Sequence, residues 1–483
     1  MEDRRLVTRT VIVLAAGEGK RMKSDLPKML HPLLGRSLVG HVLAAAAPLG
    51  AERTLAVVGN RADQVTAHLA EIAPEVSTAL QAQQNGTGHA VRIALEALGD
   101  VAGTVVVLNG DVPLLRPETL QALVEAHENA SAAATVLGAE VPNPTGLGRL
   151  VRDADGGLAR IVEERDATPE QRAIREINAG IYAFDAAALR AALAKLTTDN
   201  DQGEEYLTDV FALFVAEGSP VRVHLAADAV ETLGCNDRAE LASLRALLRD
   251  RINLDLMRSG VTIIDPATTW VDVTATVERD ALLEPNVQLR GASSVASGAV
   301  VGPDVTLIDT SVGEQAQVVR AHAVQAEIGP NVSVGPYAYL RPGARIARKG
   351  KVGTFVEIKN ASLGEGTKVP HLTYVGDATI GEHTNIGAGN LFANYSGTTK
   401  SHTTIGSHVK TSCDTTFVAP VTIGDGAYTA AGSVIGKDVP PGALAVARAH
   451  QRNIEGWVQR TRGGTASAEA AERALKEQAG EEG

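Results

Sequence analysis

The chain has 483 residues and a formal net charge of −12, with 44% hydrophobic and only 3% aromatic residues. That length is too great for one core and suggests about three domains. The negative balance argues against general nucleic-acid binding or attachment to a membrane surface, so anionic small substrates would need locally placed Lys and Arg. The two cysteines, Cys235 and Cys413, form neither a disulfide framework nor a metal-ligand spacing, which favours a reducing, cytoplasmic location. The apolar run after MEDRRLVTRT is too short for a signal peptide, and no run reaches transmembrane length.

The first half alternates strand-like and helix-like segments. Strands are expected over 10–17, 53–59 and 104–111, and helices over 38–50, 61–73 and 86–99. This alternation predicts a mostly parallel α/β sheet whose ligands bind at the C-terminal ends of the strands. A long connecting helix is predicted next, because apolar residues recur at helical spacing until Gly260.

The loop after the first strand, in VIVLAAGEGKRMKSDLPKMLHPLLGR, fits neither of two familiar phosphate-binding patterns. Met22 stands where a dinucleotide fold needs its last glycine, and Arg21 follows Lys20 where a P-loop needs Ser or Thr. A Gly-x-Gly turn followed by Lys20, Arg21 and Lys28 still suits a polyphosphate. An ordinary strand-to-helix turn with a solvated basic helix start explains the loop equally well.

Other polar clusters follow apolar strands in the same half. Asp111 ends such a strand and is a natural Mg²⁺ ligand beside phosphates, although it would also suit a cap of the following turn. Amide, backbone and hydroxyl groups suited to an uncharged nucleobase lie in LQAQQNGTGHA, and groups suited to sugar hydroxyls lie further along. The candidates are Gln81, Gly86 and Thr87 for the base, and Gly148, Glu163 and Asn178 for the sugar.

From about residue 261 an aliphatic residue recurs at every sixth position, as in VASGAV VGPDVT and IGEHTN IGAGNL. A helix cannot use a strict period of six, whereas a parallel β-helix stacks such residues from turn to turn. Two segments, 347–355 and 392–404, are expected to interrupt the repeat as ejected loops. The Ala/Glu-rich tail is expected to be disordered or weakly helical.

Several motifs of the chain together closely resemble one family. They are LAAGEGKRMKSDLPKMLHPLLG, QNGTGHA, GDVPLL, IVEERDAT, EINAGIY, LRPGA, FVEIKN, HLTYVGDA, NIGAGN, NYSG and VAPVTIGDGAY. The family is the bifunctional bacterial N-acetylglucosamine-1-phosphate uridyltransferase / glucosamine-1-phosphate acetyltransferase, and the resemblance covers about residues 9–458. It implies a doubly wound, Rossmann-like α/β nucleotidyltransferase domain followed by a left-handed parallel β-helix of hexapeptide repeats. The implied boundaries are 1–236 for the nucleotidyltransferase domain, 237–260 for the connecting helix, 261–458 for the β-helix acetyltransferase domain and 459–483 for the tail.

For the first half, the resemblance implies uridylyl transfer from UTP to N-acetylglucosamine-1-phosphate with release of pyrophosphate. Arg21 would act in catalysis, and Asp111 and Asn236 would ligate Mg²⁺. No covalent intermediate is expected, because such a transfer needs orientation and charge neutralisation more than a protein nucleophile. The residues implied to bind UDP-N-acetylglucosamine are Leu14, Ala15, Ala16, Gly17, Lys28, Gln81, Gly86, Thr87, Asn109, Gly110, Asp111, Gly148, Glu163, Asn178 and Asn236.

For the second half, the resemblance implies acetyl transfer from acetyl-CoA to glucosamine-1-phosphate. His371 would be the general base, since a protonated amine has no lone pair to attack with; without the HLTY motif, a surface histidine is the plainer interpretation. The sugar phosphate would be bound by Arg341, Lys359, Tyr374, Asn385 and Lys400, and acetyl-CoA by Ala388, Asn394, Tyr395, Cys413, Ala431 and Arg448. The family forms these sites between the coils of a homotrimer.

The chain departs from the family pattern at a few positions: Asn109 replaces a frequent Tyr, Ser396 a common Asp, and Ser412-Cys413 the usual Gly-Ser. Two rival hypotheses stand beside the bifunctional one. In the first, the coils are only a trimerising scaffold for a sugar-nucleotide pyrophosphorylase. In the second, the chain is a non-catalytic sensor, which the presence of Asp111 and Arg21 disfavours. Diffusion of the intermediate through solvent is expected in the bifunctional case.

Overall fold

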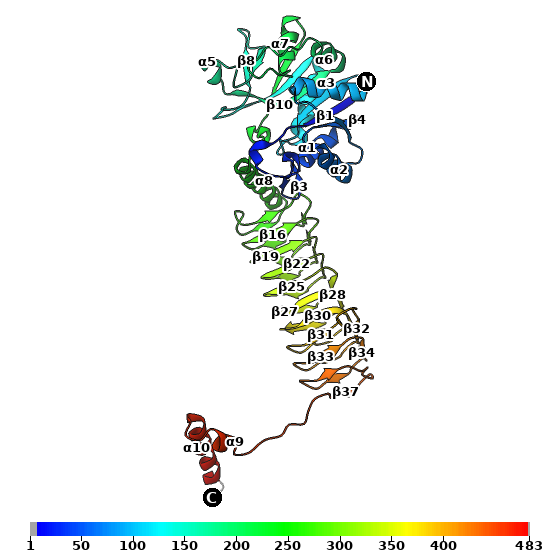
Figure 1. Ribbon diagram of the computed structural model, residues 1–483, viewed down its shortest axis with the longest axis vertical. Coiled ribbons are helices and arrows are strands. Elements are labelled where there is room, and N and C mark those ends of the chain that lie inside the picture. Colours follow the sequence, from blue (N-terminus) through cyan, green and yellow to red (C-terminus); the bar gives the residue numbers. More distant parts are fainter. Residues whose placement is uncertain (1–6, 482–483) are drawn as a thin grey trace. The chain divides into compact units, whose positions relative to one another are not determined.

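The computed structural model describes residues 7–481 (Figure 1). Two short segments lie outside the described residues: residues 1–6, at the start of the predicted first domain, and residues 482–483 of the predicted tail. The chain divides into two compact units, Met1–Gln325 and Ala326–Gly483. Of the described helices, none combines the length and the apolar character that a membrane span requires.

The first unit is built on a nine-stranded mixed sheet, whose main path has the order β11-β7-β10-β6-β1-β4-β5. As the sequence predicts, β1 lies parallel to β4 and to β6. A later strand, β10, is antiparallel to both β6 and β7, so the sheet is mixed rather than wholly parallel. The strands are β1 (Arg9–Ala15), β4 (Arg53–Val58), β5 (Ser77–Leu80), β6 (Thr104–Asn109), β7 (Ala134–Glu140), β8 (Arg149–Arg152), β9 (Leu158–Val162), β10 (Glu176–Asp185) and β11 (Val221–Leu225).

Helices cover both faces of this sheet (Figure 1). Side chains of β1 alternate between two cores, with Ile12 in the core that includes α3, α6 and α7, and Val11 and Val13 in the core that includes α1, α2 and α4. The helices are α1 (Leu38–Ala46), α2 (Ala62–Ile72), α3 (Thr87–Leu98), α4 (Pro117–Asn129), α5 (Pro169–Arg172), α6 (Ala186–Leu193) and α7 (Asp209–Ala216). Short elements are η1 (Lys20–Met22), η2 (Lys28–Leu30), β2 (Pro32–Leu33), β3 (Arg36–Ser37), η3 (Ala47–Leu49) and η4 (Ala229–Thr232).

The predicted long helix is α8 (Arg238–Arg258). It begins at Asp237, whose side chain accepts hydrogen bonds from the backbone N–H groups of Ala239 and Glu240. Its buried leucines pack with Met22 and Leu33. Helix α8 therefore holds the polar segment just before it in a fixed place beside the loop after β1.

The remainder of the first unit consists of β-helix coils. Leu282 of one coil pairs in parallel with Val300 of the next, which is eighteen residues or three hexads later. The strands are β12 (Thr262–Ile263), β13 (Trp270–Val271), β14 (Thr276–Val277), β15 (Leu282–Leu283), β16 (Val287–Arg290), β17 (Ser294–Val295), β18 (Val300–Val301), β19 (Val305–Ile308), β20 (Ser311–Val312), β21 (Gln317–Val318) and β22 (Ala321–Val324).

The second unit continues the same pattern and confirms the predicted β-helix class. One aliphatic column runs through paired positions from Ile328 to Ile346, Leu363 and Ile380, each at most 2% exposed. The strands are β23 (Glu327–Ile328), β24 (Ser333–Val334), β25 (Ala338–Leu340), β26 (Ala344–Ile346), β27 (Lys351–Thr354), β28 (Glu357–Leu363), β29 (Lys368–His371), β30 (Tyr374–Ile380), β31 (Leu391–Ala393), β32 (Thr403–Ile405), β33 (Thr416–Val418), β34 (Val421–Ile423), β35 (Tyr428–Thr429), β36 (Val434–Ile435) and β37 (Leu444–Ala445). The tail contains α9 (Trp457–Thr461) and α10 (Ala466–Glu481).

One of the two predicted loops is wrong and the other is confirmed. Segment 347–355 contains β27, where Lys351 pairs with Ser333 and with Lys368, so it is an ordinary part of a coil. In contrast, Leu391 pairs with Thr416, twenty-five residues later, because an extra loop leaves the coil between β31 and β32.

Candidate functional sites

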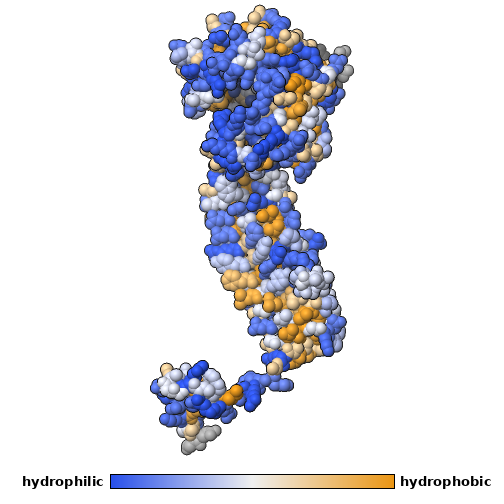
Figure 2. All heavy atoms as spheres, in the orientation of Figure 1, coloured by the Kyte–Doolittle hydropathy of each residue, from blue (hydrophilic) through white to orange (hydrophobic). Residues whose placement is uncertain are grey.

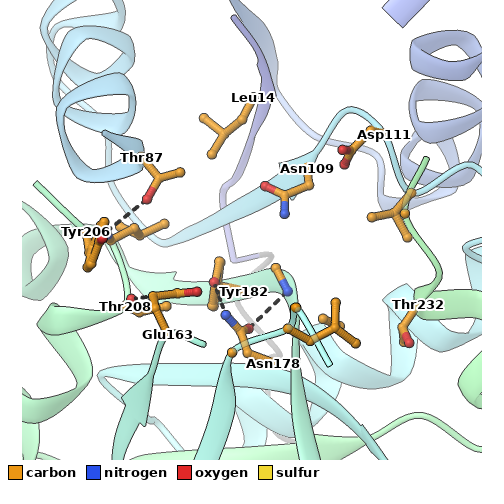
Figure 3. A pocket seen from close by; sticks show the side chains of 18 of the residues that line it. Leu14, Thr87, Asn109, Asp111, Glu163, Asn178, Tyr182, Tyr206, Thr208 and Thr232 are labelled. Atoms are coloured by element: carbon orange, nitrogen blue, oxygen red, sulfur yellow. Dashed lines mark hydrogen bonds between the residues drawn. The ribbon is translucent and has the colours of Figure 1, made fainter. Parts of the chain in front are cut away.

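Two adjoining cavities lie at the C-terminal ends of β1 and β6 in the first unit, the position expected for ligands of an α/β sheet. Their volumes are ≈ 330 Å³ and ≈ 300 Å³. Figure 3 shows the larger one, with Asp111 and Asn109 facing the strand that carries Asn178 across the opening. Both cavities are lined by Leu14, Thr87, Asn109, Asp111 and Glu204. Together they form one continuous candidate site for a ligand with two parts.

The smaller cavity contains most of the predicted nucleotide-binding residues. Gln81 is 5% exposed, and its side-chain nitrogen lies 3.0 Å from the Gly86 carbonyl and 3.1 Å from His89 Nδ1. Gln84 donates to the Ala16 carbonyl over 2.6 Å, so the loop at 81–86 is tied to the loop after β1. The two segments that the sequence assigns to base and phosphate therefore line one wall each of the same cavity.

A lysine joins the two predicted metal ligands. Lys28 is 9% exposed, and its Nζ lies 2.5 Å from Asp111 Oδ2 and 3.1 Å from Asn236 Oδ1. The backbone fixes both partners, because the Cys235 N–H donates to the Asp111 carbonyl at 2.9 Å. The Asn236 N–H donates to Glu240 in the first turn of α8 at 2.6 Å. Three segments far apart in sequence therefore converge on one charged point.

This convergence fits a magnesium ion. Mg²⁺ prefers oxygen ligands and is bound by one or two carboxylates together with substrate phosphates and water. The Asp111 carboxylate and the Asn236 amide oxygen both point at a cation, the Lys28 ammonium. Within residues 7–481, no three or more His, Cys, Asp or Glu side chains form a metal-binding group, so phosphate oxygens and water would complete the shell.

The larger cavity contains the predicted sugar-binding residues. Asn178 donates through Nδ2 to the Tyr182 hydroxyl over 2.8 Å and accepts from the Gly180 N–H over 3.0 Å, so its side chain is fixed in orientation (Figure 3). Glu163 lies within 3.3 Å of the Thr208 hydroxyl. A Cβ atom on Gly148 would lie 3.4 Å from both Asn178 and Glu163, so the glycine keeps space between them.

The buried position of Glu163 predicts a measurable pH effect. Burial raises the pKa of Glu163 above its ordinary value of 4.5, and nearby Asp209 and Asp166 raise it further. A carboxyl with a raised folded pKa favours the fold below pH 4.5, and that contribution is lost as the pH rises through the folded pKa. Glu163→Gln should therefore raise the thermal unfolding midpoint at pH 8, with a gain that shrinks towards pH 5. A gain that grows towards pH 5 would contradict this.

Most predicted residues of the first half are gathered here, but three are not. Arg21 is exposed on η1, and neither cavity is lined by Arg21, Ala15 or Gly110. Gly110 instead lets the chain pass close to β1, since its N–H donates to the Leu14 carbonyl over 2.9 Å. The cavity residues that fit the prediction are Leu14, Ala16, Gly17, Lys28, Gln81, Gly86, Thr87, Asn109, Asp111, Gly148, Glu163, Asn178 and Asn236.

Sequence reasoning missed one wall of the larger cavity. It is formed by Gln202, Glu204, Tyr206, Leu207 and Thr208, just before α7. The Leu207 N–H donates to the Thr87 hydroxyl over 3.0 Å, which joins this segment to the start of α3. A polar run leading directly into an apolar helix was the available signal.

Gly86 lies where the start of α3 contacts the segment just before α7. Its φ is +105°, and an added Cβ would clash with the backbone of Glu205. We expect Gly86→Ala to cost about 1–3 kcal/mol of stability and to raise the KM for the nucleotide predicted to bind in this cavity, because the 81–87 loop must move. Thermal unfolding and KM are the measurements. Gly99→Ala is the matched control, since its φ is +69° with nothing within 4 Å; an unchanged KM in Gly86→Ala would contradict the expectation.

In the second unit, three of the six predicted acetyl-CoA residues, Ala388, Cys413 and Ala431, lie with His371 on one corner of successive coils. The Gly389 N–H donates to the His371 carbonyl, the Asp414 N–H to the Ala388 carbonyl, and the Gly432 N–H to the Cys413 carbonyl. His371, Ala388, Cys413 and Ala431 therefore occupy neighbouring levels of one column. His371 and Cys413 are both exposed there.

The predicted sugar-phosphate residues surround the neighbouring strands. Arg341 donates to Glu357 over 2.8 Å, and Glu357 pairs in register with Tyr374. Lys359 on β28 and Lys400 on the ejected loop interact with each other, and this lowers the pKa of Lys400. Asn385 pairs with Lys368 and Lys410 on another column, and Arg448 is exposed beyond β37.

The ejected loop is organised by its own side chains. Asn394 at its start is 8% exposed, whereas Tyr395 is 61% exposed. Ser396, the departure from the family Asp, accepts from the Thr399 N–H over 3.1 Å and so closes the turn as an Asp would. Lys400 closes the loop through a backbone bridge to Tyr395. The serine thus retains the local turn chemistry.

Comparison with known proteins matches this arrangement. Residues 11–212 match the family model of the MobA-like NTP transferase domain. Bifunctional protein GlmU of Streptomyces coelicolor is 60% identical over 474 residues, which are 98% of this chain and 98% of that protein. Bifunctional protein GlmU of Corynebacterium efficiens is 54% identical over 98% of each chain, and that of Mycolicibacterium vanbaalenii is 56% identical over 95% of this chain and 94% of its own. With a nucleotidyltransferase domain, β-helix coils and this degree of identity along nearly its whole length, the chain belongs to the bifunctional GlmU family.

Proposed function

We propose that this bifunctional enzyme, which makes UDP-N-acetylglucosamine for cell-wall synthesis, divides its two activities between its domains. Uridylyl transfer is assigned to residues 1–236 and acetyl transfer to the coils of 261–458, with 237–260 as the connecting helix and 459–483 as the tail. The convergence of Lys28, Asp111 and Asn236 beside a two-part cavity is the observation that carries the first assignment. We further propose a cytoplasmic location, in keeping with two free cysteines.

In the first domain, the residues bind and orient two anionic substrates. Gln81, Gly86 and Thr87 hold the uracil. Glu163 accepts hydrogen bonds from the sugar, and Asn178 donates hydrogen bonds to it. Lys28 and Arg21 neutralise phosphate charge, and Arg21 reaches the phosphates from its exposed position on η1. Mg²⁺, held by Asp111 and Asn236, supplies further neutralisation of phosphate charge.

The reaction is an in-line displacement. An oxygen of N-acetylglucosamine-1-phosphate attacks the α-phosphorus of UTP, the bond to the β-phosphate oxygen breaks, and pyrophosphate leaves. Fixing both substrates on rigid strand ends supplies most of what such a step requires. No protein nucleophile is needed.

In the coils, His371 accepts the proton that the amine of glucosamine-1-phosphate loses as it attacks the thioester carbonyl of acetyl-CoA. The carbon–sulfur bond then breaks, the proton held by His371 passes to the sulfur, and CoA leaves as the thiol. Arg341, Lys359 and Lys400 supply positive charge for the sugar phosphate, with Tyr374 beside them and Asn385 as a further contact from another column. Acetyl-CoA lies along the column of Ala388, Cys413 and Ala431, with Asn394, Tyr395 and Arg448 as its other contacts.

We also propose a homotrimer that completes the acetyl-transfer site. Apolar side chains are exposed on the coils of the second unit: Phe355 is 58%, Leu372 62%, Leu391 50% and Val434 57% exposed. Figure 2 shows apolar surface on these coils. Contiguous apolar surface of this kind marks interaction sites. Light scattering should give the mass of three chains, and a monomer with full acetyl-transfer activity would contradict the proposal.

The test of the two activities uses purified protein with glucosamine-1-phosphate, acetyl-CoA, UTP and Mg²⁺, while free CoA and pyrophosphate are followed together. Release of both products is the expected result. If pyrophosphate appears only when N-acetylglucosamine-1-phosphate is supplied, the coils are a scaffold and Cys413 is the first residue to examine. Omission of Mg²⁺ should stop pyrophosphate release but not CoA release.

A further inference from the structure

A buried carboxylate with no assigned role lies at the centre of the second unit's polar cluster. Asp377 lies within β30 and is 8% exposed. Asn360, one coil earlier, donates to Asp377 Oδ1 over 2.7 Å. Asn394, one coil later, donates to Oδ2. Both carboxylate oxygens are therefore held by amides from the neighbouring coils.

Two lysines face this carboxylate. Although burial alone would raise the pKa of Asp377, hydrogen bonds from the two amides and the charges of Lys359 and Lys400 hold it below its ordinary value. The group is therefore ionised at neutral pH. No ion pair of the described residues includes either lysine, so neither ammonium is within salt-bridge distance of a carboxylate.

The two lysines also face each other. Lys359 lowers the pKa of Lys400, whereas Asp377 and Tyr374 act in the opposite direction. Two ammonium groups at close range repel, and a fixed negative charge behind them reduces that cost. Lys400 is exposed, so the pair can be reached by an anion.

We propose that Asp377 is a positioning residue of the acetyl-transfer site, which holds Asn394 in place and keeps Lys359 and Lys400 together as one binding site for a phosphate dianion. This inference rests on the proposed function of the second unit. The Asp377 carboxylate links Asn394, which is assigned to acetyl-CoA, with Lys359 and Lys400, which are assigned to the sugar phosphate. Asp377 itself does not touch either substrate.

Asp377→Asn removes the charge with almost no change in shape. One oxygen of the carboxylate becomes an NH₂ group, so one of the two amides from Asn360 and Asn394 faces a donor. We expect the KM for glucosamine-1-phosphate to rise about 10-fold or more, from the loss of hydrogen bonds to a charged group. The KM for acetyl-CoA should rise less, and kcat should change least, since His371 is untouched.

The pH dependence of the KM for glucosamine-1-phosphate distinguishes a positioning role of Asp377 from a merely structural one. Without the Asp377 charge, Lys400 loses its proton at a lower pH, with only Tyr374 left to oppose Lys359. The KM for glucosamine-1-phosphate should therefore begin to rise at a lower pH in Asp377→Asn than in the wild type, over pH 7 to 9.5. An unchanged profile, or an equal loss at every pH, would overturn the proposal.

Controls keep the outcomes distinct. Thermal unfolding of the full-length protein reports whether the coils of the variant are folded, and its uridylyl transfer should be unchanged. Asp425→Asn is the matched control, because Asp425 accepts from the Ser407 N–H on another corner and should leave both KM values unchanged. If Asp377→Asn cannot be purified, Asn360→Ala removes one donor to the carboxylate, and an unchanged KM there overturns the proposal. A wild type without acetyl transfer would instead refute the proposed function.

Discussion

His371→Ala is expected to reduce acetyl transfer by about 10²–10⁴-fold in kcat while uridylyl transfer continues at the wild-type rate with N-acetylglucosamine-1-phosphate. The reason is that the attacking amine must lose a proton, and His371 is the titratable group at the head of the column assigned to acetyl-CoA. The loss should appear in kcat more than in KM, because a base acts on the transition state rather than on binding.

A second exposed histidine provides the control. His383 lies on a coil of the same unit, and its ring stacks on His408 with centroids 5.3 Å apart. His383→Ala should leave CoA release unchanged. Wild-type acetyl transfer in His371→Ala would show that another group, or water, accepts the proton.

Asp111→Asn should have the complementary effect, with uridylyl transfer reduced about 10²–10³-fold and acetyl transfer unchanged. The substitution removes the negative charge that holds Lys28 and that would bind Mg²⁺. Pyrophosphate release should then require higher Mg²⁺ concentrations, since the amide is a weaker ligand.

A control variant is also available for the Asp111→Asn measurement. Asp155→Asn changes an exposed turn between β8 and β9 and should leave pyrophosphate release and its Mg²⁺ dependence as in the wild type. If Asp111→Asn kept full activity at low Mg²⁺, Asp111 would be a cap of its own turn, as the plainer interpretation of the sequence has it.

The sequence predicted the period of the coils but misjudged one interruption. In 347–355 the aliphatic period is in fact intact, because Ile346, Val352 and Ile358 are all buried at six-residue intervals. Basic residues at the outward positions between them hid the repeat. The genuine loop, between β31 and β32, differs because its pairing partners are twenty-five residues apart.

Residues of the candidate site could be predicted from the sequence where they directly follow an apolar strand. Site residues in other segments were harder to predict. Asp111 and Gly17 follow apolar strands, and that pattern alone indicates the ligand edge of the sheet. Tyr206 and Thr208 do not follow an apolar strand, and the polar run before α7 does not indicate which site it lines, because the contact with α3 brings this segment to the cavity. The link from Asn360 through Asp377 to Asn394 depends on coil register, which a single motif does not reveal.

The most direct measurement combines the two inactive variants. His371→Ala and Asp111→Asn proteins are assembled separately and then mixed with glucosamine-1-phosphate, acetyl-CoA, UTP and Mg²⁺. Together they should form UDP-N-acetylglucosamine at least about 100-fold faster than either variant alone. That result follows if the two sites are independent and the intermediate diffuses between them. The contradicting result is a mixture that releases CoA but no pyrophosphate. This result counts only if Asp111→Asn still acetylates glucosamine-1-phosphate and His371→Ala still uridylylates added N-acetylglucosamine-1-phosphate.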